Sequence, residues 1–170
     1  MESHHRVVVT GLGLVSPLGC DVATFWERVK TGQSGIGPIT KFDTTGFETT
    51  IAGEVQEFNV DAFIEKKEQR RMDPYTHYAI AASKLALADS GLDMGREDPT
   101  RAGVIVGSGV GGLQTLQTQH TTYMTKGLGR LSPFMIPQMI SNMASGLVGI
   151  ALGFKGANYG AVSACASAAH

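Results

Sequence analysis

Acidic side chains are missing from the second half of this 170-residue chain. All fifteen Asp and Glu residues lie at or before Asp98, so none occurs from Pro99 to His170. The charged residues in that half are all basic: Arg101, Lys126, Arg130 and Lys155. The rest is apolar and rich in glycine, a composition typical of interior or interface rather than of solvated surface.

Cysteines and long apolar runs are also scarce. The two cysteines, Cys20 and Cys165, form no spacing motif, and we find no signal peptide. We therefore expect reduced thiols and a cytoplasmic protein. The most apolar stretch, residues 143–154, is short and contains three glycines, so we expect no membrane span.

The composition that remains is that of a globular domain. Hydrophobic residues make up 42% and charged residues 17%, and there are 22 glycines. A chain of this length can form one domain with a sizeable core. Asp21 and Asp73-Pro74 are expected helix starts. The pattern predicts strands at 6–11, 49–55, 103–106 and 159–162, and helices at 22–31, 74–90, 113–124 and 138–152. This alternation indicates a layered α/β fold.

A glycine-rich turn follows the strand expected at 103–106. Gly107-Ser108-Gly109-Val110-Gly111-Gly112 lies between a strand and a helix, as in a dinucleotide-binding turn. That fingerprint needs an acidic residue about 20 positions later to hold the ribose. None follows Asp98, so we reject a dinucleotide site. The glycines are expected to let the backbone pass close to another element or to line a channel.

The stretch Gly156–His170 contains the candidate nucleophile. A short strand is expected to end near Val162, and small residues from Ser163 suit a tight turn into a helix. Cys165 would then lie in the first helical turn, where free N–H groups and the helix dipole favour a thiolate. A free cysteine among Ala and Ser can equally be a small buried hydrophobe. The local sequence leaves both interpretations open.

A charged run precedes the expected helix at 74–90. The run Glu65–Asp73 contains Lys67, Arg70 and Arg71. From the sequence alone we interpret it as a solvated helical face with internal ion pairs. His77 and His120 have no acidic partner at a recognisable spacing, so we expect structural or surface roles for them.

Several motifs together resemble one enzyme family. They occur in this order: Val9-Thr10-Gly11-Leu12-Gly13, Lys67-Glu68-Gln69-Arg70-Arg71-Met72-Asp73, Gly107-Ser108-Gly109-Val110-Gly111-Gly112, Ser132-Pro133-Phe134 and the turn at Cys165. The ordered set resembles the N-terminal portion of the 3-oxoacyl-acyl-carrier-protein synthase II (beta-ketoacyl synthase) family. It covers nearly all 170 residues.

The resemblance implies a fold, an activity and partners. The fold is thiolase-like, with layers α-β-α-β-α, of which this chain would form most of the N-terminal half. The activity is fatty-acid elongation by an acyltransferase, in which an acyl group on Cys165 condenses with a decarboxylating malonyl group. The implied partners are acyl-carrier protein and a second subunit in a homodimer. No cofactor, metal, nucleic acid or membrane is implied.

Individual residues match family positions. Cys165 matches the catalytic nucleophile. Val110 matches the gate of the acyl-chain pocket, and Met135 and Ile136 match residues that the partner subunit contributes to it. The basic patch that receives the carrier protein corresponds to Lys67, Arg70, Arg71 and Arg130. Gly129 falls where many relatives have another basic residue, so that part of the patch is expected to be weaker.

The sequence departs from the family pattern after the nucleophile. Two catalytic His, a Lys and a Gly-rich oxyanion loop lie downstream in the family, and His170 matches none of them. We therefore expect residues 1–170 to be an N-terminal synthase domain truncated after Cys165, and inactive alone. The alternatives are a non-catalytic fragment or a non-catalytic partner subunit similar to a chain-length factor. Chain-length factors replace the nucleophile, whereas Cys165 is retained.

Overall fold

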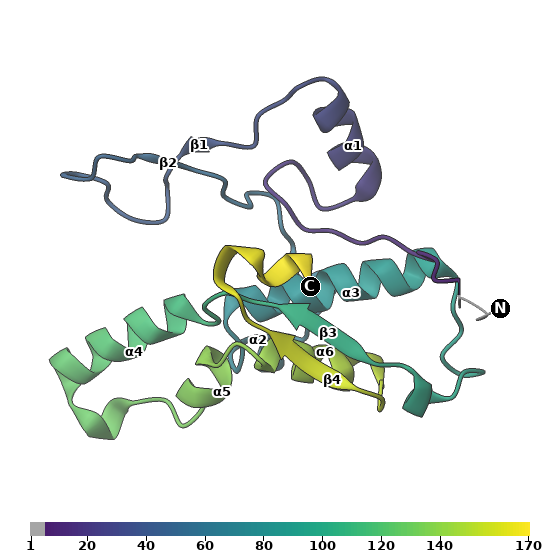
Figure 1. Cartoon of the computed structure of the whole chain (residues 1–170). Helices are drawn as coiled ribbons and strands as arrows, with labels where there is room; N and C mark the ends of the chain where they lie inside the picture. Colours follow the sequence, from purple (N-terminus) through teal and green to yellow (C-terminus); the bar gives the residue numbers. More distant parts are fainter. Residues whose placement is uncertain (1–5) are drawn as a thin grey trace.

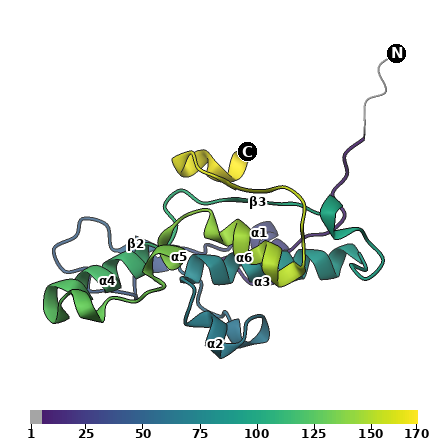
Figure 2. The same ribbon diagram turned by 90° about the horizontal axis from the view of Figure 1, so that it is seen from below.

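The computed structural model describes residues 6–170, arranged around a short parallel strand pair (Figure 1). Strands β3 (Val104–Gly107) and β4 (Asn158–Ala161) pair with Val104 opposite Asn158 and Gly107 opposite Ala161. Helices α3 (Pro74–Ser90) and α6 (Met143–Leu152) cover one face of the pair, and the 3₁₀ helix η4 (Ala164–Ala169) lies on the other (Figure 2). This layering confirms the α/β prediction.

The long helix α3 forms where its end signals predicted. The Asp73 side chain accepts a hydrogen bond from the Tyr75 N–H, Pro74 occupies the first turn, and Gly91 ends the helix with φ 67°. Its small residues allow α6 to approach closely, because Ala81 and Ala144 are completely buried. Around this contact the core is small, and its buried members are Ile64, Ile80, Val104 and Val148.

Residues 20–52 extend away from the strand pair as short elements (Figure 1). The Asp21 carboxylate caps α1 (Val22–Lys30) by accepting from the Thr24 N–H at 2.8 Å, as predicted. The strand expected within 49–55 is β2 (Ile51–Ala52), which pairs antiparallel with β1 (Gly37–Pro38). The 3₁₀ helix η1 (Val60–Ala62) and α2 (Lys66–Gln69) then lead into α3.

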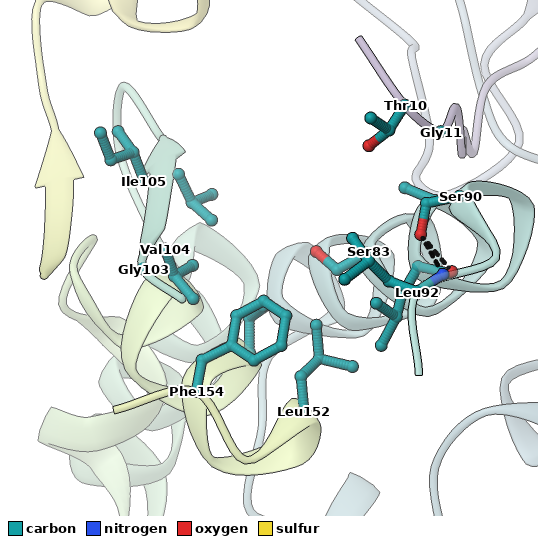
Figure 3. Close-up of a pocket in the computed structure, with 14 residues that line it drawn as sticks. Thr10, Gly11, Ser83, Ser90, Leu92, Gly103, Val104, Ile105, Leu152 and Phe154 are labelled. Atoms are coloured by element: carbon teal, nitrogen blue, oxygen red, sulfur yellow. Dashed lines mark hydrogen bonds between the residues drawn. The ribbon is translucent and has the colours of Figure 1, made fainter. Parts of the chain in front are cut away.

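The strand predicted at 6–11 is wrong, because within residues 6–170 no strand pairs with this segment. Val7 and Val9 are 91% and 81% exposed in an extended segment. A cavity of about 320 Å³, lined by Thr10, Gly11 and part of β3, separates this segment from the strand pair (Figure 3). The segment is held instead on α3, where a Cβ on Gly11 would lie 2.2 Å from the Ala86 carbonyl oxygen.

The single helix predicted at 138–152 is also wrong. Two helices form, α5 (Met135–Met139) and α6, because Ile140 has an extended backbone conformation. The Gly112 N–H donates to the Met139 carbonyl oxygen at 2.8 Å and thereby satisfies an acceptor that a longer helix would have used. Pro137 lies in the first turn of α5, where its missing N–H costs no helical hydrogen bond.

Two further helices complete the chain. Helix α4 (Leu113–Lys126) begins where predicted, and the 3₁₀ helix η3 (Leu128–Arg130) packs against it. Figure 1 shows α4 and α5 beside each other, beyond one end of the strand pair. Across residues 6–170, none of the helices combines the length and apolarity that crossing a bilayer requires.

Candidate functional site

The candidate nucleophile Cys165 lies in the first turn of η4, which begins shortly after β4 ends. Its side chain is solvent-exposed, so the interpretation as a buried hydrophobe is wrong. The preceding residue, Ala164, has φ 50°, a left-handed conformation that non-glycine residues adopt at a cost. This turn leaves the Cys165 thiol open to solvent beyond the end of β4.

The α-helix predicted after the turn does not form. Residues 164–169 are a 3₁₀ helix, so the argument from an α-helix N-terminus does not apply to Cys165. The backbone is tied locally by Ser167, whose hydroxyl accepts from the Ser163 N–H at 2.9 Å and donates to the Ala164 carbonyl at 2.7 Å. Ser167 is buried. The sequence analysis missed this anchor, which no periodicity or spacing marks.

The glycine-rich turn packs directly against η4, which contains Cys165. A Cβ on Gly107 would lie 2.3 Å from the Ser167 carbonyl oxygen, and one on Gly109 would lie 3.1 Å from that of Ala164. Only glycine therefore lets η4 approach the end of β3 this closely. The prediction that these glycines allow close backbone passage is confirmed.

The other half of the same turn packs against α5. A Cβ on Gly111 would lie 2.2 Å from the Met139 carbonyl oxygen, and one on Gly112 the same distance from that of Gln138. Val110 lies between the two contacts and is 68% exposed. The structure thus brings the turn of Cys165, the Val110 turn and α5 together in one continuous backbone arrangement.

The predicted pocket residues on α5 are partly open in the single chain. Met135 is half-buried and Ile136 is 54% exposed. Helix α5 is held in place from α3, because the Tyr75 hydroxyl donates to the Ile140 carbonyl oxygen at 2.7 Å. Val110 and Ile136 are therefore fixed through their backbones while their side chains remain unenclosed.

The predicted basic residues are all exposed, but they do not share one element. Lys67 lies on α2, Arg70 and Arg71 follow it directly, and Arg130 lies on η3. The Arg71 guanidinium lies 3.5 Å from a Glu68 oxygen and 5.1 Å above the centre of the Phe134 ring. Internal ion pairs of the predicted kind exist, and Phe134 is a contact that the sequence did not reveal.

The histidines of the described region have structural or surface positions. A ring nitrogen of His77 lies 3.2 Å from the Gln69 carbonyl oxygen, and burial lowers the pKa of His77 below its ordinary value. His120 is exposed, and the His170 ring contacts the Ser163 hydroxyl at 2.5 Å. No group of three His, Cys, Asp or Glu side chains within residues 6–170 is arranged to hold a metal ion.

Comparison with known proteins gives consistent results. The family described as "Beta-ketoacyl synthase, N-terminal domain" matches residues 4–170. The chain is 46% identical over 167 residues to 3-oxoacyl-[acyl-carrier-protein] synthase 2 of Staphylococcus aureus (strain COL), and 46% identical over 162 residues to the protein of that name in Synechocystis. These alignments cover 98% and 95% of this chain but 40% and 39% of the relatives.

Solved structures agree on the fold. The ishigamide ketosynthase/chain length factor superimposes with a TM-score of 0.82 at 26% identity and covers 90% of this chain. A beta-ketoacyl synthase from Burkholderia phymatum STM815 superimposes with a TM-score of 0.78 at 29% identity and covers 95% of this chain. This chain spans 38% and 40% of those two proteins, and the thiolase-like condensing-enzyme fold class is thereby confirmed.

Proposed function

Because the chain belongs to the beta-ketoacyl synthase family, we propose that it is the N-terminal synthase domain, residues 1–170, of a longer fatty-acid-elongating enzyme. The proposal rests on one observation above all, the exposed Cys165 thiol on the strained turn that follows β4. The chain spans about 40% of the curated relatives' length. The longer enzyme is called the full-length protein below.

The proposed reaction has two covalent stages. The Cys165 thiolate attacks the carbonyl carbon of an acyl thioester, and the thiolate of the carrier protein leaves. A malonyl thioester on a second carrier protein then loses carbon dioxide, and the resulting carbanion attacks the acyl carbon. A carbon–carbon bond forms, the Cys165 thiolate departs, and the chain is two carbons longer. The groups that assist decarboxylation and hold the oxyanion would lie in the rest of the full-length protein.

The remaining site residues fit this reaction by their positions. Val110 would gate the acyl pocket, which α5 of a second subunit in a homodimer would close with Met135 and Ile136. The exposure of Val110 and Ile136 in one chain supports a pocket that needs a partner. An acidic acyl-carrier protein in the cytoplasm would dock on the exposed basic side chains of Lys67, Arg70, Arg71 and Arg130.

A non-catalytic partner subunit is the second candidate function. One structural neighbour is a ketosynthase/chain length factor, so the fold alone does not separate the two roles. The retained and accessible thiol of Cys165 favours the catalytic role.

The test is thiol labelling of the full-length protein. We expect iodoacetamide to modify Cys165 before Cys20, because Cys165 is exposed and the half-buried Cys20 thiol contacts the Glu57 carbonyl at 3.6 Å. Peptide mapping by mass spectrometry measures the order. Acyl transfer from acyl-carrier protein should be lost in Cys165→Ala and kept in Cys20→Ala. Preferential modification of Cys20, or acyl transfer by Cys165→Ala, would contradict the proposed nucleophile.

A further inference from the structure

The short segment Arg70–Asp73 joins α2 to α3 and is called the link segment here. It contacts α5 and the start of α4, the two helices next to the proposed acyl pocket. Two of its residues belong to the proposed docking surface for the carrier protein. Its other end contacts the start of α4. The link segment therefore connects the proposed docking surface to α4 and α5, the two helices next to the proposed acyl pocket.

Helix α5 is attached to the link segment by two contacts. The Gln138 side-chain amide donates to the Arg70 carbonyl oxygen at 2.9 Å. The Arg71 guanidinium lies over the ring of Phe134, the residue directly before Met135. Because Arg71 is exposed and its guanidinium also lies 3.5 Å from a Glu68 oxygen, an acidic partner competes with Glu68 for the cation that lies over Phe134.

Helix α4 is attached to the link segment by a buried carboxylate. Asp73 is 4% exposed, and one of its oxygens accepts from the Thr115 N–H at 2.8 Å and from the Thr115 hydroxyl at 2.7 Å. Helix α4 has Gly112 at its N-cap and so lacks a side-chain cap of its own. Asp73 therefore caps α4 as well as α3, and it fixes the chain just after Val110.

We infer that the link segment is a specificity-determining positioning element, which couples docking of an acidic carrier protein to the shape of the acyl pocket. This inference rests on the proposed function. Its consequence is that the chain length accepted at Cys165 depends on whether the acyl group arrives on a carrier protein or on a small thiol. The two paths run through Gln138 to α5 and through Asp73 to α4.

The test compares two substrate series on the full-length protein. In one series the acyl group is carried by acyl-carrier protein, and in the other by pantetheine. Within each series, kcat/KM for a long acyl chain is divided by kcat/KM for a short one. We expect the two ratios to differ about fivefold or more, the lower end of measured couplings between sites. In Gln138→Met, which lacks the donor to Arg70, the difference should fall below about twofold.

A matched control separates this effect from local packing. Gln114 lines the same cavity of about 200 Å³ as Gln138 but makes no side-chain hydrogen bond among the described residues. Gln114→Met should keep the full difference between the two series. Thr115→Val, which removes only the hydroxyl donor to Asp73, should reduce the difference from the α4 side and provides a second variant if Gln138→Met does not fold.

Specific outcomes overturn the inference. If the two ratios are equal in the active native enzyme, or if Gln138→Met and Thr115→Val change both series by the same factor, the link segment only supports the fold. If the native enzyme transfers no acyl group to Cys165 from either substrate, the proposed function fails and the coupling fails with it. Activity toward acyl-pantetheine distinguishes these two failures.

Discussion

At the residue scale, the backbone positions around Cys165 are set by side chains that are small or missing. Gly107 and Gly109 leave room for the carbonyl oxygens of Ser167 and Ala164, and Gly111 leaves room for that of Met139. Val110 is the one large side chain in this turn, and it is 68% exposed. A substitution at Val110 therefore changes the exposed surface of the turn and leaves the backbone contacts of its glycines intact.

Enlarging Val110 to Phe should shorten the acyl chains that the full-length protein accepts. Added volume in a packed pocket costs about 1–3 kcal/mol, so kcat/KM for the longest accepted chain should fall about 5- to 150-fold. The shortest substrates should be nearly unaffected. Product chain lengths, measured by mass spectrometry, report the result. An unaltered chain-length profile removes Val110 from the pocket.

His77 should make the protein less stable in mild acid. Burial lowers the pKa of His77 in the folded state, so the unfolded chain, with an imidazole pKa of about 6.5, binds the proton more readily. The contribution of neutral His77 to stability is complete above that pH and is lost progressively as the pH falls below it. In His77→Gln the fall in the thermal midpoint of the full-length protein between pH 7 and pH 5 should be smaller. His120→Gln, at an exposed position, should retain the native fall. Equal falls in all three proteins would contradict this role.

At the element scale, the residues that begin and end a helix predicted structure better than strand patterns, which need a partner strand. Asp21, Asp73 and Gly91 act locally, and the helices that they delimit are where the sequence placed them. The segment at 6–11 has the β-branched composition of a strand, but a strand also needs a neighbour, which composition does not supply. The break between α5 and α6 depends on the carbonyl of Met139 meeting Gly112.

The candidate site was likewise only partly predictable from the sequence. Cys165, Val110 and the basic residues came from ordered motifs, while their surroundings came only from the structure. The contact of Arg71 with Phe134 and the two hydrogen bonds from Thr115 to Asp73 join residues more than forty positions apart. Such contacts arise from tertiary packing, which leaves no periodic signal in a single sequence.

The basic segment at α2 should steer the carrier protein by charge. In the double variant Lys67→Ala with Arg70→Ala, affinity for acyl-carrier protein should fall and depend less on salt, because screened attraction between opposite charges is lost. Surface plasmon resonance between 50 and 300 mM NaCl, roughly the range over which screening changes most, measures both. The rate at which iodoacetamide labels Cys165 should stay the same. Unchanged affinity in the double variant would restore the interpretation as a solvated face.

At the scale of the whole molecule, the chain exposes far more surface than its mass requires. Its accessible area is 11945 Å², whereas a monomeric protein of 18.0 kDa has about 8,000 Å². The exposed apolar residues include both neighbours across the strand pair, Ile105 and Tyr159. An excess of this size is comparable to large obligate interfaces, so the surface suits contact with further protein.

Residues 1–170 expressed alone should therefore be poorly soluble and inactive in condensation. Exposed apolar surface and a free strand edge both favour aggregation. Catalytic groups act as a set, so the nucleophile without the decarboxylating and oxyanion-stabilising groups should release no carbon dioxide from malonyl-carrier protein. Size-exclusion chromatography and carbon dioxide release are the measurements. A monodisperse 18 kDa species that turns over malonyl-carrier protein would contradict this.

The parallel pairing of β3 and β4 has a consequence for how the protein is made. Their register partners Val104 and Asn158 lie roughly fifty residues apart, with α4, α5 and α6 between them. A ribosome adds about 5–20 residues per second, so β3 leaves it about 3–10 seconds before β4 does. During that interval Val104 and Ile105 have no strand beside them. The nascent chain therefore presents an apolar strand that a chaperone can bind before Cys165 has been translated.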